Sequence, residues 1–417
     1  MTSREKVLAA LAHTPGPVPL DFGATAVTGI HCSIVEKLRD HHGLAKTPVK
    51  ISDPYQMLGE IDADLCAALG IDTRPIPPRL TMFGYEQTGW KEWRTPWNQV
   101  VLVGQNFHIT EKPDGARIHP RGNPSAEPCA LLPGTGFFFD AINRQKPCDE
   151  DNLTLADNLE EFTDLSEADL AHWRRQAALI RDSGHQHATV ASLPGTALGD
   201  IALVPGLALE SPRGIRGVED WYMLLASDEN FVNRLFAAQT ETALRNLEKI
   251  HAIMGDTIDA ALVCGTDFGT QTGTFCSIEK FRRLWFPRYK TINDWIHKNT
   301  PWKTMKHSCG AIDTFLPDLI ACGFDIINPV QCSATGMDPR HLKEKYGSRL
   351  AFWGGAIDTQ RVLPFGTPAQ VRAQARERLE IFSTRGGFVF NAIHNIQAGT
   401  PLENVLALLE TLREFNQ

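Results

Sequence analysis

Apolar and polar positions along the second half of the chain predict a parallel sheet wrapped by helices. From Asp164 onward, short apolar runs alternate with longer stretches of helical periodicity. The expected strands are His187–Ser192, Ala260–Cys264, Lys303–His307, Asp325–Asn328, Leu350–Trp353 and Gly387–Asn391. The expected helices are Glu167–Ser183, Val218–Leu225, Glu229–Met254, Ile278–Lys298, Ile312–Ala321, Pro368–Phe382 and Leu402–Phe415.

The first half begins with the same alternation of helices and strands, and its pattern of apolar and polar residues then changes. Helices are expected over Ser3–Ala12 and Cys32–His41, and the apolar run Val18–Phe22 between prolines and glycines predicts a strand. Residues 80–118 alternate aromatic and polar side chains around a tight turn at residues 111–115, which predicts a β-rich insertion, assigned to residues 78–125. The Pro- and Gly-rich segment 121–150 is expected to be an ordered loop or a lid.

With Val18–Phe22 included, seven strands are visible along the chain. Their number, the chain length and the regular alternation with helices favour a (β/α)8 TIM barrel, taken as a single domain over residues 1–417. A doubly wound sheet is the alternative.

Composition narrows the class of partner. The chain has 41 Lys+Arg and 49 Asp+Glu, a formal net charge of −8, which lacks the basic footprint of a nucleic-acid-binding protein. No apolar run approaches the roughly 20 residues that span a bilayer. Residues 1–11 carry charges where a signal peptide would be apolar, so a cytoplasmic protein with no membrane partner is expected.

The nine cysteines are odd in number and irregular in spacing, so a disulfide framework is not expected. Most should be buried apolar fillers in a reducing compartment, and at least one is a candidate ligand. The nine are Cys32, Cys66, Cys129, Cys148, Cys264, Cys276, Cys309, Cys322 and Cys332.

Candidate chemistry collects after the expected strands, where a barrel places its active site. The side chains there are of the types that hold a metal or a small polar ligand. They are Asp21, Asp267, His307, Cys309, Asn328, Gln331, Asp358, Asn391, His394 and Gln397.

The sharpest feature is the pair His307 and Cys309 in the sequence His-Ser-Cys-Gly. Side chains two apart on an extended strand end point to the same side, so both can bind one ion. Imidazole and thiolate together suit Zn²⁺, and His394 after a later strand supplies a third ligand. Three protein ligands leave one position for substrate, as in catalytic zinc sites.

Simpler interpretations stay open at several of these positions. Asp267 can equally be a turn or helix-capping residue, and Asn328 and Gln331 can satisfy loop backbone groups. Cys332 is an alternative ligand to Cys309, although it has no partner at a suitable spacing.

These strand ends resemble the uroporphyrinogen decarboxylase superfamily, and within it the corrinoid-linked methyltransferases that act on coenzyme M or on methyl ethers. The resemblance is strongest over residues 258–415. The segments that carry it are His307–Gly310, Pro317–Ile320, Asn328–Gln331, Phe352–Gly355 and Gly386–Phe390. The resemblance implies a (β/α)8 barrel and zinc bound by His307 and Cys309.

The resemblance also implies a third zinc ligand after the last strand, which in that branch is usually a cysteine. Alignment on Gly386–Phe390 and Thr400–Asn404 places His394 there. A His₂Cys site has one thiolate fewer, so its zinc should be the stronger Lewis acid and should favour demethylation of a substrate.

At the strand ends, Asp267 and Gln331 are the expected catalytic residues. Asp21, Asn328, Asp358, Asn391 and Gln397 are the expected substrate-binding residues. The expected partners are a small methylated substrate and a corrinoid protein, because the chain lacks the Asp-x-His-x-x-Gly pattern that would hold the corrinoid itself. A homodimer is left open.

Two other functions compete with this prediction. One is a metal-free decarboxylase or lyase, which the absence of an Arg-rich motif near residues 18–29 disfavours because an acidic tetrapyrrole would need such cations. The other is a barrel that binds a small ligand without chemistry.

Overall fold

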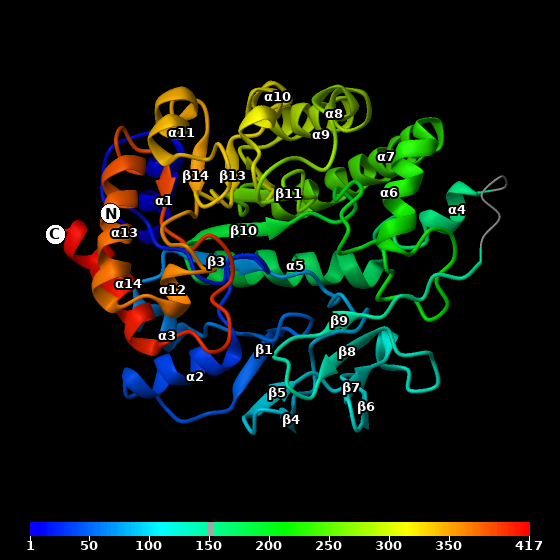
Figure 1. Cartoon of the computed structure of the whole chain (residues 1–417), viewed down its shortest axis with the longest axis horizontal. Coiled ribbons are helices and arrows are strands. Elements are labelled where there is room, and N and C mark those ends of the chain that lie inside the picture. The colour runs from blue at the N-terminus through cyan, green and yellow to red at the C-terminus, as the bar shows by residue number, and fades with distance from the viewer. Residues whose placement is uncertain (148–152) are drawn as a thin grey trace.

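A computed structural model of the chain describes residues 1–147 and 153–417 and is built around a seven-stranded parallel sheet (Figure 1). The sheet has the order β15-β14-β13-β12-β11-β10-β3, and every neighbouring pair is parallel. Its strands are β3 (Thr73–Ile76), β10 (Ala188–Ser192), β11 (Ala260–Cys264), β12 (Lys303–His307), β13 (Ile326–Asn328), β14 (Ala351–Trp353) and β15 (Phe388–Val389). The mixed α/β architecture with a curled parallel sheet is consistent with a TIM-like fold.

Residues 19–21 connect the two edges of this sheet. On one side, Phe390 donates its backbone N–H to Pro19 O at 2.8 Å, and Asp21 donates to Phe390 O at 3.0 Å. On the other side, Asp72, next to β3, donates to Leu20 O at 2.8 Å. In place of the predicted strand Val18–Phe22, the structure has one parallel bridge, between Leu20 and Phe390. This segment nevertheless lies between β15 and β3 and joins them.

Strand β3 was not predicted from the sequence. Its residues Thr-Arg-Pro-Ile offer no apolar run, and Pro75 argues against a ladder position because it has no N–H. Its pairing with β10, which extends from Thr73–Ala188 to Ile76–Ala191, comes from long-range packing.

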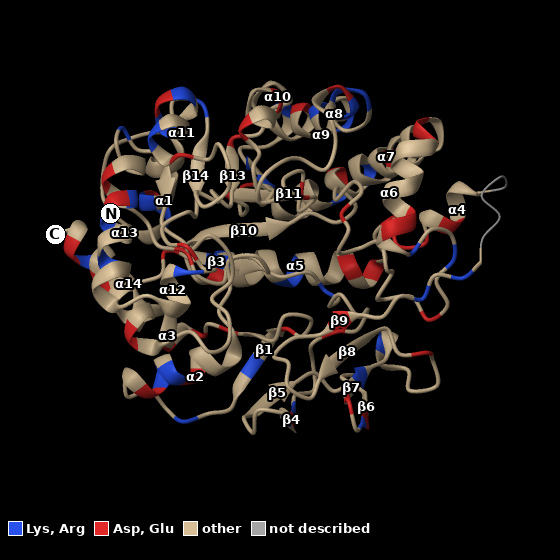
Figure 2. Cartoon of the chain, in the orientation of Figure 1, with Lys and Arg blue, Asp and Glu red and all other residues tan. Residues whose placement is uncertain are grey.

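The helices cover the outside of the sheet, and Figure 2 shows Lys, Arg, Asp and Glu on many of them. Their bounds are α1 (Ser3–Leu11), α2 (Cys32–His41), α3 (Ala63–Leu69), α4 (Leu155–Asn158), α5 (Glu167–Asp182), α6 (Val218–Ser227), α7 (Glu229–Met254), α8 (Ile278–Leu284), α9 (Phe286–Asn299), α10 (Leu316–Ala321), α11 (Pro339–Tyr346), α12 (Val362–Phe365), α13 (Pro368–Phe382) and α14 (Leu402–Phe415). Short 3₁₀ turns lie at Pro120–Gly122 and Asp313–Phe315.

Two predicted helices are interrupted in the structure. The helix predicted over Ile278–Lys298 is divided at Trp285 into α8 and α9, where Pro287 lacks the N–H that would continue the first helix. The helix predicted over Ile312–Ala321 begins as a 3₁₀ turn before α10, whose first turn contains Pro317. No helix among the described residues is long and apolar enough to cross a membrane.

Apolar side chains form two buried layers. The inner layer lies inside the curled sheet and includes Val190, Met305 and Trp353, with Val7 and Leu11 of α1 closing one end. The outer layer packs the opposite faces of the strands against the surrounding helices. The alternation of strand side chains between the two layers fixes which residues can point into the barrel.

Two small antiparallel-rich sheets lie to one side of the main sheet (Figure 1). One has the order β2-β1-β5-β4, and the other has β6-β7-β8-β9. Their strands are β1 (Val49–Asp53), β2 (Leu58–Gly59), β4 (Lys91–Arg94), β5 (Val100–Val103), β6 (Ile109–Lys112), β7 (Gly115–Ile118), β8 (Ala130–Pro133) and β9 (Asp140–Ala141). The tight turn predicted at residues 111–115 joins β6 to β7. Part of the segment 121–150 and Cys148 lie outside the described residues.

Candidate metal centre

His307, Cys309 and His394 come together at the end of the curled sheet where the strands finish. Each offers one ligand atom, and the three atoms lie within 4.8 Å of one another. His307 is the last residue of β12, and its Nε2 lies 3.6 Å from Cys309 Sγ. The rings of His307 and His394 have centroids 5.8 Å apart. Two nitrogens and one sulfur in a tight group are a donor set that suits zinc.

Asn328 fixes the orientation of the His307 ring. Its Oδ1 lies 2.6 Å from His307 Nδ1, and its Nδ2 donates to Trp353 O at 2.9 Å. Because Nδ2 is bound to a carbonyl, Oδ1 must be the atom that faces the imidazole. His307 therefore carries its proton on Nδ1, and the lone pair of Nε2 points to Cys309.

Asp267 and Gln331 hold the loop that carries Cys309. Asp267 Oδ1 accepts a hydrogen bond from Cys309 N at 2.7 Å and lies 4.0 Å from His307 Nε2. Gln331 Oε1 accepts from Gly310 N at 2.7 Å, and its Nε2 donates to Gln271 Oε1 at 3.0 Å. Both side chains therefore accept hydrogen bonds from loop backbone N–H groups, which is the simpler of the two roles that the sequence left open for them.

Burial sets the protonation of the three candidate ligands. Desolvation raises the pKa of the Cys309 thiol, and the neighbouring Asp267 raises it further. Desolvation lowers the pKa of His394 to about 4, and the nearby His307 adds to that shift. Desolvation also lowers the pKa of His307. The imidazoles are thus neutral and able to bind a cation, which would in turn favour the thiolate.

Lys306 was missed by sequence reasoning. It is fully buried on the outward side of β12, where Nζ donates to Thr266 O at 2.5 Å and to His307 O. The ammonium also lies 5.0 Å from the ring centroid of Phe268. The sequence does contain a signal for this residue. Strand β12 is buried on both faces, so a lysine at one of its outward positions must be buried and must find hydrogen-bond acceptors.

Asp21 takes a structural position that differs from the predicted contact with substrate. Its Oδ1 accepts from Thr73 Oγ1 at 2.7 Å and from Ala24 N at 3.1 Å, while Oδ2 accepts from Trp353 Nε1 at 2.7 Å. The residue is fully buried, and desolvation raises its pKa. Both oxygens are used to tie residues 19–21 to β3 and β14.

Asp358 and Gln397 also lie differently from expectation. Asp358 Oδ1 accepts from Gln360 N at 2.7 Å and from Arg361 N at 3.1 Å, which makes it a turn residue before α12. The Gln397 side chain is exposed. Neither is part of the group formed by His307, Cys309 and His394.

Asn391 keeps an open acceptor at the end of β15. Its Nδ2 donates to Asp21 O at 2.7 Å, which fixes the amide orientation. Its Oδ1 is buried and has no hydrogen-bond partner among the described residues. A buried acceptor without a partner is costly, so this atom is suited to receive a hydrogen bond from a ligand or a water molecule.

The other described cysteines are free thiols. Cys332, the alternative ligand, is not in the metal-binding group, and Arg378, Asp338 and Glu377 are the charges near it. Cys309 is the cysteine that the structure brings to two histidines.

Comparisons with known proteins bear on the family resemblance and on the fold. The family model for uroporphyrinogen decarboxylase (URO-D) matches residues 211–415. The uroporphyrinogen decarboxylases of three Coxiella burnetii strains are 32% identical over 89 residues, which cover 20% of this chain and 24% of theirs, so the match spans about a quarter of these curated relatives. Among solved structures, a methyltransferase from Methanosarcina mazei is similar over 100% of both chains, with a TM-score of 0.56 and 17% identity, which supports the fold.

Proposed function

We propose that this chain, whose residues 211–415 match the uroporphyrinogen decarboxylase family model, is a zinc-dependent methyltransferase of that superfamily. It moves a methyl group between a small methylated substrate and a corrinoid protein. The observation that carries the proposal is the grouping of His307, Cys309 and His394 within 4.8 Å. We assign residues 1–417 to one (β/α)8 barrel in which residues 19–21 take the eighth strand position and residues 78–125 form an insertion.

The three side chains fit a catalytic zinc ion. They supply two neutral imidazoles and one thiolate, and three protein ligands leave a position for substrate. When bound, zinc would act as a Lewis acid that polarises the substrate oxygen, nitrogen or sulfur bearing the methyl group. One thiolate in the set favours this demethylating direction over the release of a strongly nucleophilic thiolate. A corrinoid carried by a partner protein would be the methyl carrier.

The side chains around the three ligands would orient the ligands and the substrate and would move protons. Asn328 holds the His307 imidazole with Nε2 free. Asp267 uses Oδ1 on the Cys309 loop, while Oδ2 makes no hydrogen bond within residues 1–147 and 153–417, so this oxygen is placed to orient the substrate or to carry a proton. Asn391 Oδ1 would accept a hydrogen bond from the substrate.

The proposal is tested by metal analysis together with methyl transfer. The purified protein should contain zinc near one equivalent and should methylate free cob(I)alamin from a member of a panel of methyl ethers, methylamines and methyl sulfides. His341→Ala, at an exposed histidine paired with Asp313, is the matched control for His307→Ala. A protein without zinc, or with full activity after His307→Ala, would contradict the proposal.

A metal-free decarboxylase is the second candidate, because the similar curated relatives carry that name. Decarboxylation of uroporphyrinogen by the metal-depleted protein would support it in place of methyl transfer.

A further inference from the structure

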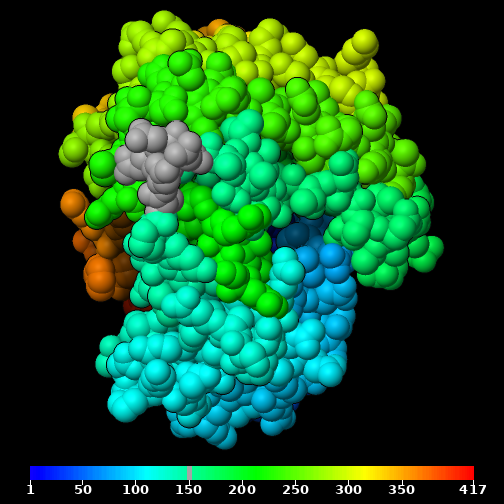
Figure 3. Space-filling model, turned by 90° about the vertical axis from the view of Figure 1, so that its right-hand side faces the viewer, coloured from blue at the N-terminus to red at the C-terminus, as the bar shows by residue number. Residues whose placement is uncertain are grey.

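A cavity of about 460 Å³ opens beside the curled sheet, at the ends of β3 and β10. Figure 3 shows this side of the molecule hollowed, with dark blue residues from the N-terminal part of the chain at the floor of the hollow. The cavity wall combines proline rings, small residues and apolar side chains. The wall includes Thr81, Met82, Glu161, Phe162 and Leu203.

The charged residues of this wall are all acidic. Its residues include no lysine, arginine or histidine, but they include Asp53 and Glu161. Asp53 is buried and accepts hydrogen bonds from Tyr55 N at 2.8 Å and from Gln56 Nε2 at 3.0 Å, and desolvation raises its pKa. Glu161 is paired with the buried Arg216 at 2.9 Å. The wall therefore offers no free cation to an anionic ligand.

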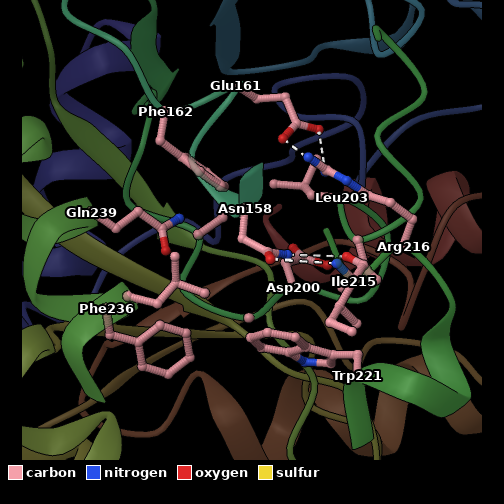
Figure 4. Close-up of a pocket in the computed structure, with 14 residues that line it drawn as sticks. Asn158, Glu161, Phe162, Asp200, Leu203, Ile215, Arg216, Trp221, Phe236 and Gln239 are labelled. Atoms are coloured by element: carbon pink, nitrogen blue, oxygen red, sulfur yellow. Dashed lines mark hydrogen bonds and ion pairs between the residues drawn. The ribbon is translucent and has the colours of Figure 1, made fainter. Parts of the chain in front are cut away.

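Two smaller cavities share wall residues with this cavity or with each other, and one of them is bordered by Asp267. One of about 40 Å³ shares Glu161, Phe162 and Leu203 with it and also contacts Asp200 and Trp221 (Figure 4). Another of about 250 Å³ shares Gly199 and Trp221 with that small cavity and is bordered by Asp267. The three cavities therefore form a row of neighbours, and Asp267, which borders the last of them, also holds the Cys309 loop and lies 4.0 Å from His307 Nε2.

Two cations along this row, Arg216 and Lys280, are paired with carboxylates, whereas the buried Lys306 donates to the carbonyl oxygens of Thr266 and His307 and lines none of the three cavities. Arg216 contacts Glu160 and Glu161, as Figure 4 shows for Glu161. Lys280 contacts Glu229 at 3.2 Å and donates to Leu225 O at 2.6 Å. The carboxyl of Asp200, in contrast, has no lysine or arginine within 4.0 Å among the described residues. Its Oδ1 accepts from Ala202 N at 3.0 Å, and its surroundings raise its pKa by burial.

From the cavity walls we propose that this row of cavities binds an uncharged, apolar, ring-sized molecule and rejects anions. An anion would lose its hydration without gaining a cation, and it would face Asp53, Asp200 and Asp267. A cavity of about 460 Å³ has room for a substituted ring system. The identification of this molecule as the methyl donor rests on the proposed function, whereas its binding does not.

The test compares two probes that differ by one charge, 2-methoxynaphthalene and 6-methoxy-2-naphthoate, by titration calorimetry on the full chain. The wild-type protein should bind the neutral probe at least about tenfold more tightly. Met82→Lys puts an ammonium into the wall on a side chain of similar length, and should shift the ratio by about tenfold toward the naphthoate. Met223→Lys is the matched control, because Met223 is 64% exposed and borders none of the three cavities. Thr81→Lys repeats the test if Met82→Lys does not fold.

Preference for the naphthoate, no binding of the neutral probe, or equal ratios in the Met82→Lys and Met223→Lys proteins would overturn the inference. Zinc content measured on the same samples separates the two proposals. Zinc-containing protein that does not bind the neutral probe contradicts only the ligand class. Zinc-free protein that binds it contradicts only the zinc methyltransferase.

Discussion

Asn328 Oδ1 lies 2.6 Å from Nδ1 of His307, across the last registered pair of β12 and β13. The same amide is anchored to Trp353 O on β14, so three neighbouring strands determine the direction of one imidazole. A histidine held in this way presents Nε2 with little further ordering cost when a metal binds.

Asn328→Leu should therefore lower zinc affinity by about 10- to 100-fold, because His307 would lose its tautomer and its fixed ring orientation. The measurement is competition with a coloured chelator. Asn328→Asp keeps an acceptor oxygen and should retain more of the affinity than the leucine variant. Equal affinity in the wild-type and leucine proteins would show that the ring is held by packing alone.

His394→Ala should reduce zinc binding by at least about 100-fold, because it removes a ligand atom itself and not an outer partner. His394→Cys should keep the metal and weaken its Lewis acidity, since it adds a second thiolate. Zinc analysis of the purified variants checks both. Unchanged metal content in His394→Ala would remove this histidine from the ligand set.

Asp267→Asn should lower kcat by about 10²-fold or more while zinc content stays the same. The amide oxygen can still accept from Cys309 N, so the loop is preserved and the carboxylate alone is lost. Asp294→Asn, at an exposed carboxylate paired with Lys290, is the control. A normal kcat in Asp267→Asn would leave Asp267 with a purely structural role.

Gly310→Ala should destabilise the fold by more than about 2 kcal/mol and also impair metal binding. Gly310 has φ +87°, and a Cβ there would lie 2.4 Å from the Gly269 carbonyl carbon and 2.6 Å from Thr270 O. Gly43 has φ +63° with nothing near a built Cβ, so Gly43→Ala should cost only about 1 kcal/mol. Urea unfolding of the two variants gives the comparison, and equal costs would argue against contact between the loops.

Lys343→Met should stabilise the protein at neutral pH by about 2 kcal/mol. Desolvation, aided by Arg385, lowers the pKa of Lys343 from 10.5 to about 8, and among the described residues Nζ donates only to Gly386 O. His13 also lies close, and Lys343 lowers its pKa after desolvation. Below about pH 8 the folded state holds an ammonium that it disfavours.

Between pH 8 and 10.5 the unfolded chain binds more protons than the folded one at Lys343, so wild-type stability should rise with pH in that window. The advantage of Lys343→Met should shrink accordingly. Urea unfolding at pH 7 and at about pH 10 measures the change. An advantage that is constant with pH would mean that Lys343 is not the group that titrates.

Local periodicity was sufficient for much of the fold. Helices α7 and α14 and strands β11 and β12 have the bounds predicted from the sequence. Elements α7, α14 and β11 each carry a complete apolar pattern within their own residues. The spacing of His307 and Cys309 also predicted that the two side chains meet. Because Cys309 lies on the loop after β12, hydrogen bonds from that loop to Asp267 and Gln331 hold it in place.

What the sequence could not decide depends on contacts between distant segments. Asp21 was predicted to touch substrate, but Thr73 and Trp353, 52 and 332 residues away along the chain, use its oxygens. Strand β3 exists because β10 and residues 19–21 offer it partners, against its own propensity. The wall of the large cavity, which contains no Lys, Arg or His, is assembled from loops after several strands, and only the closed sheet brings those loops together. Side-chain types and local spacing thus determined the candidate ligands. Closure of the sheet decided which polar groups hydrogen-bond within the fold and which remain available to a ligand.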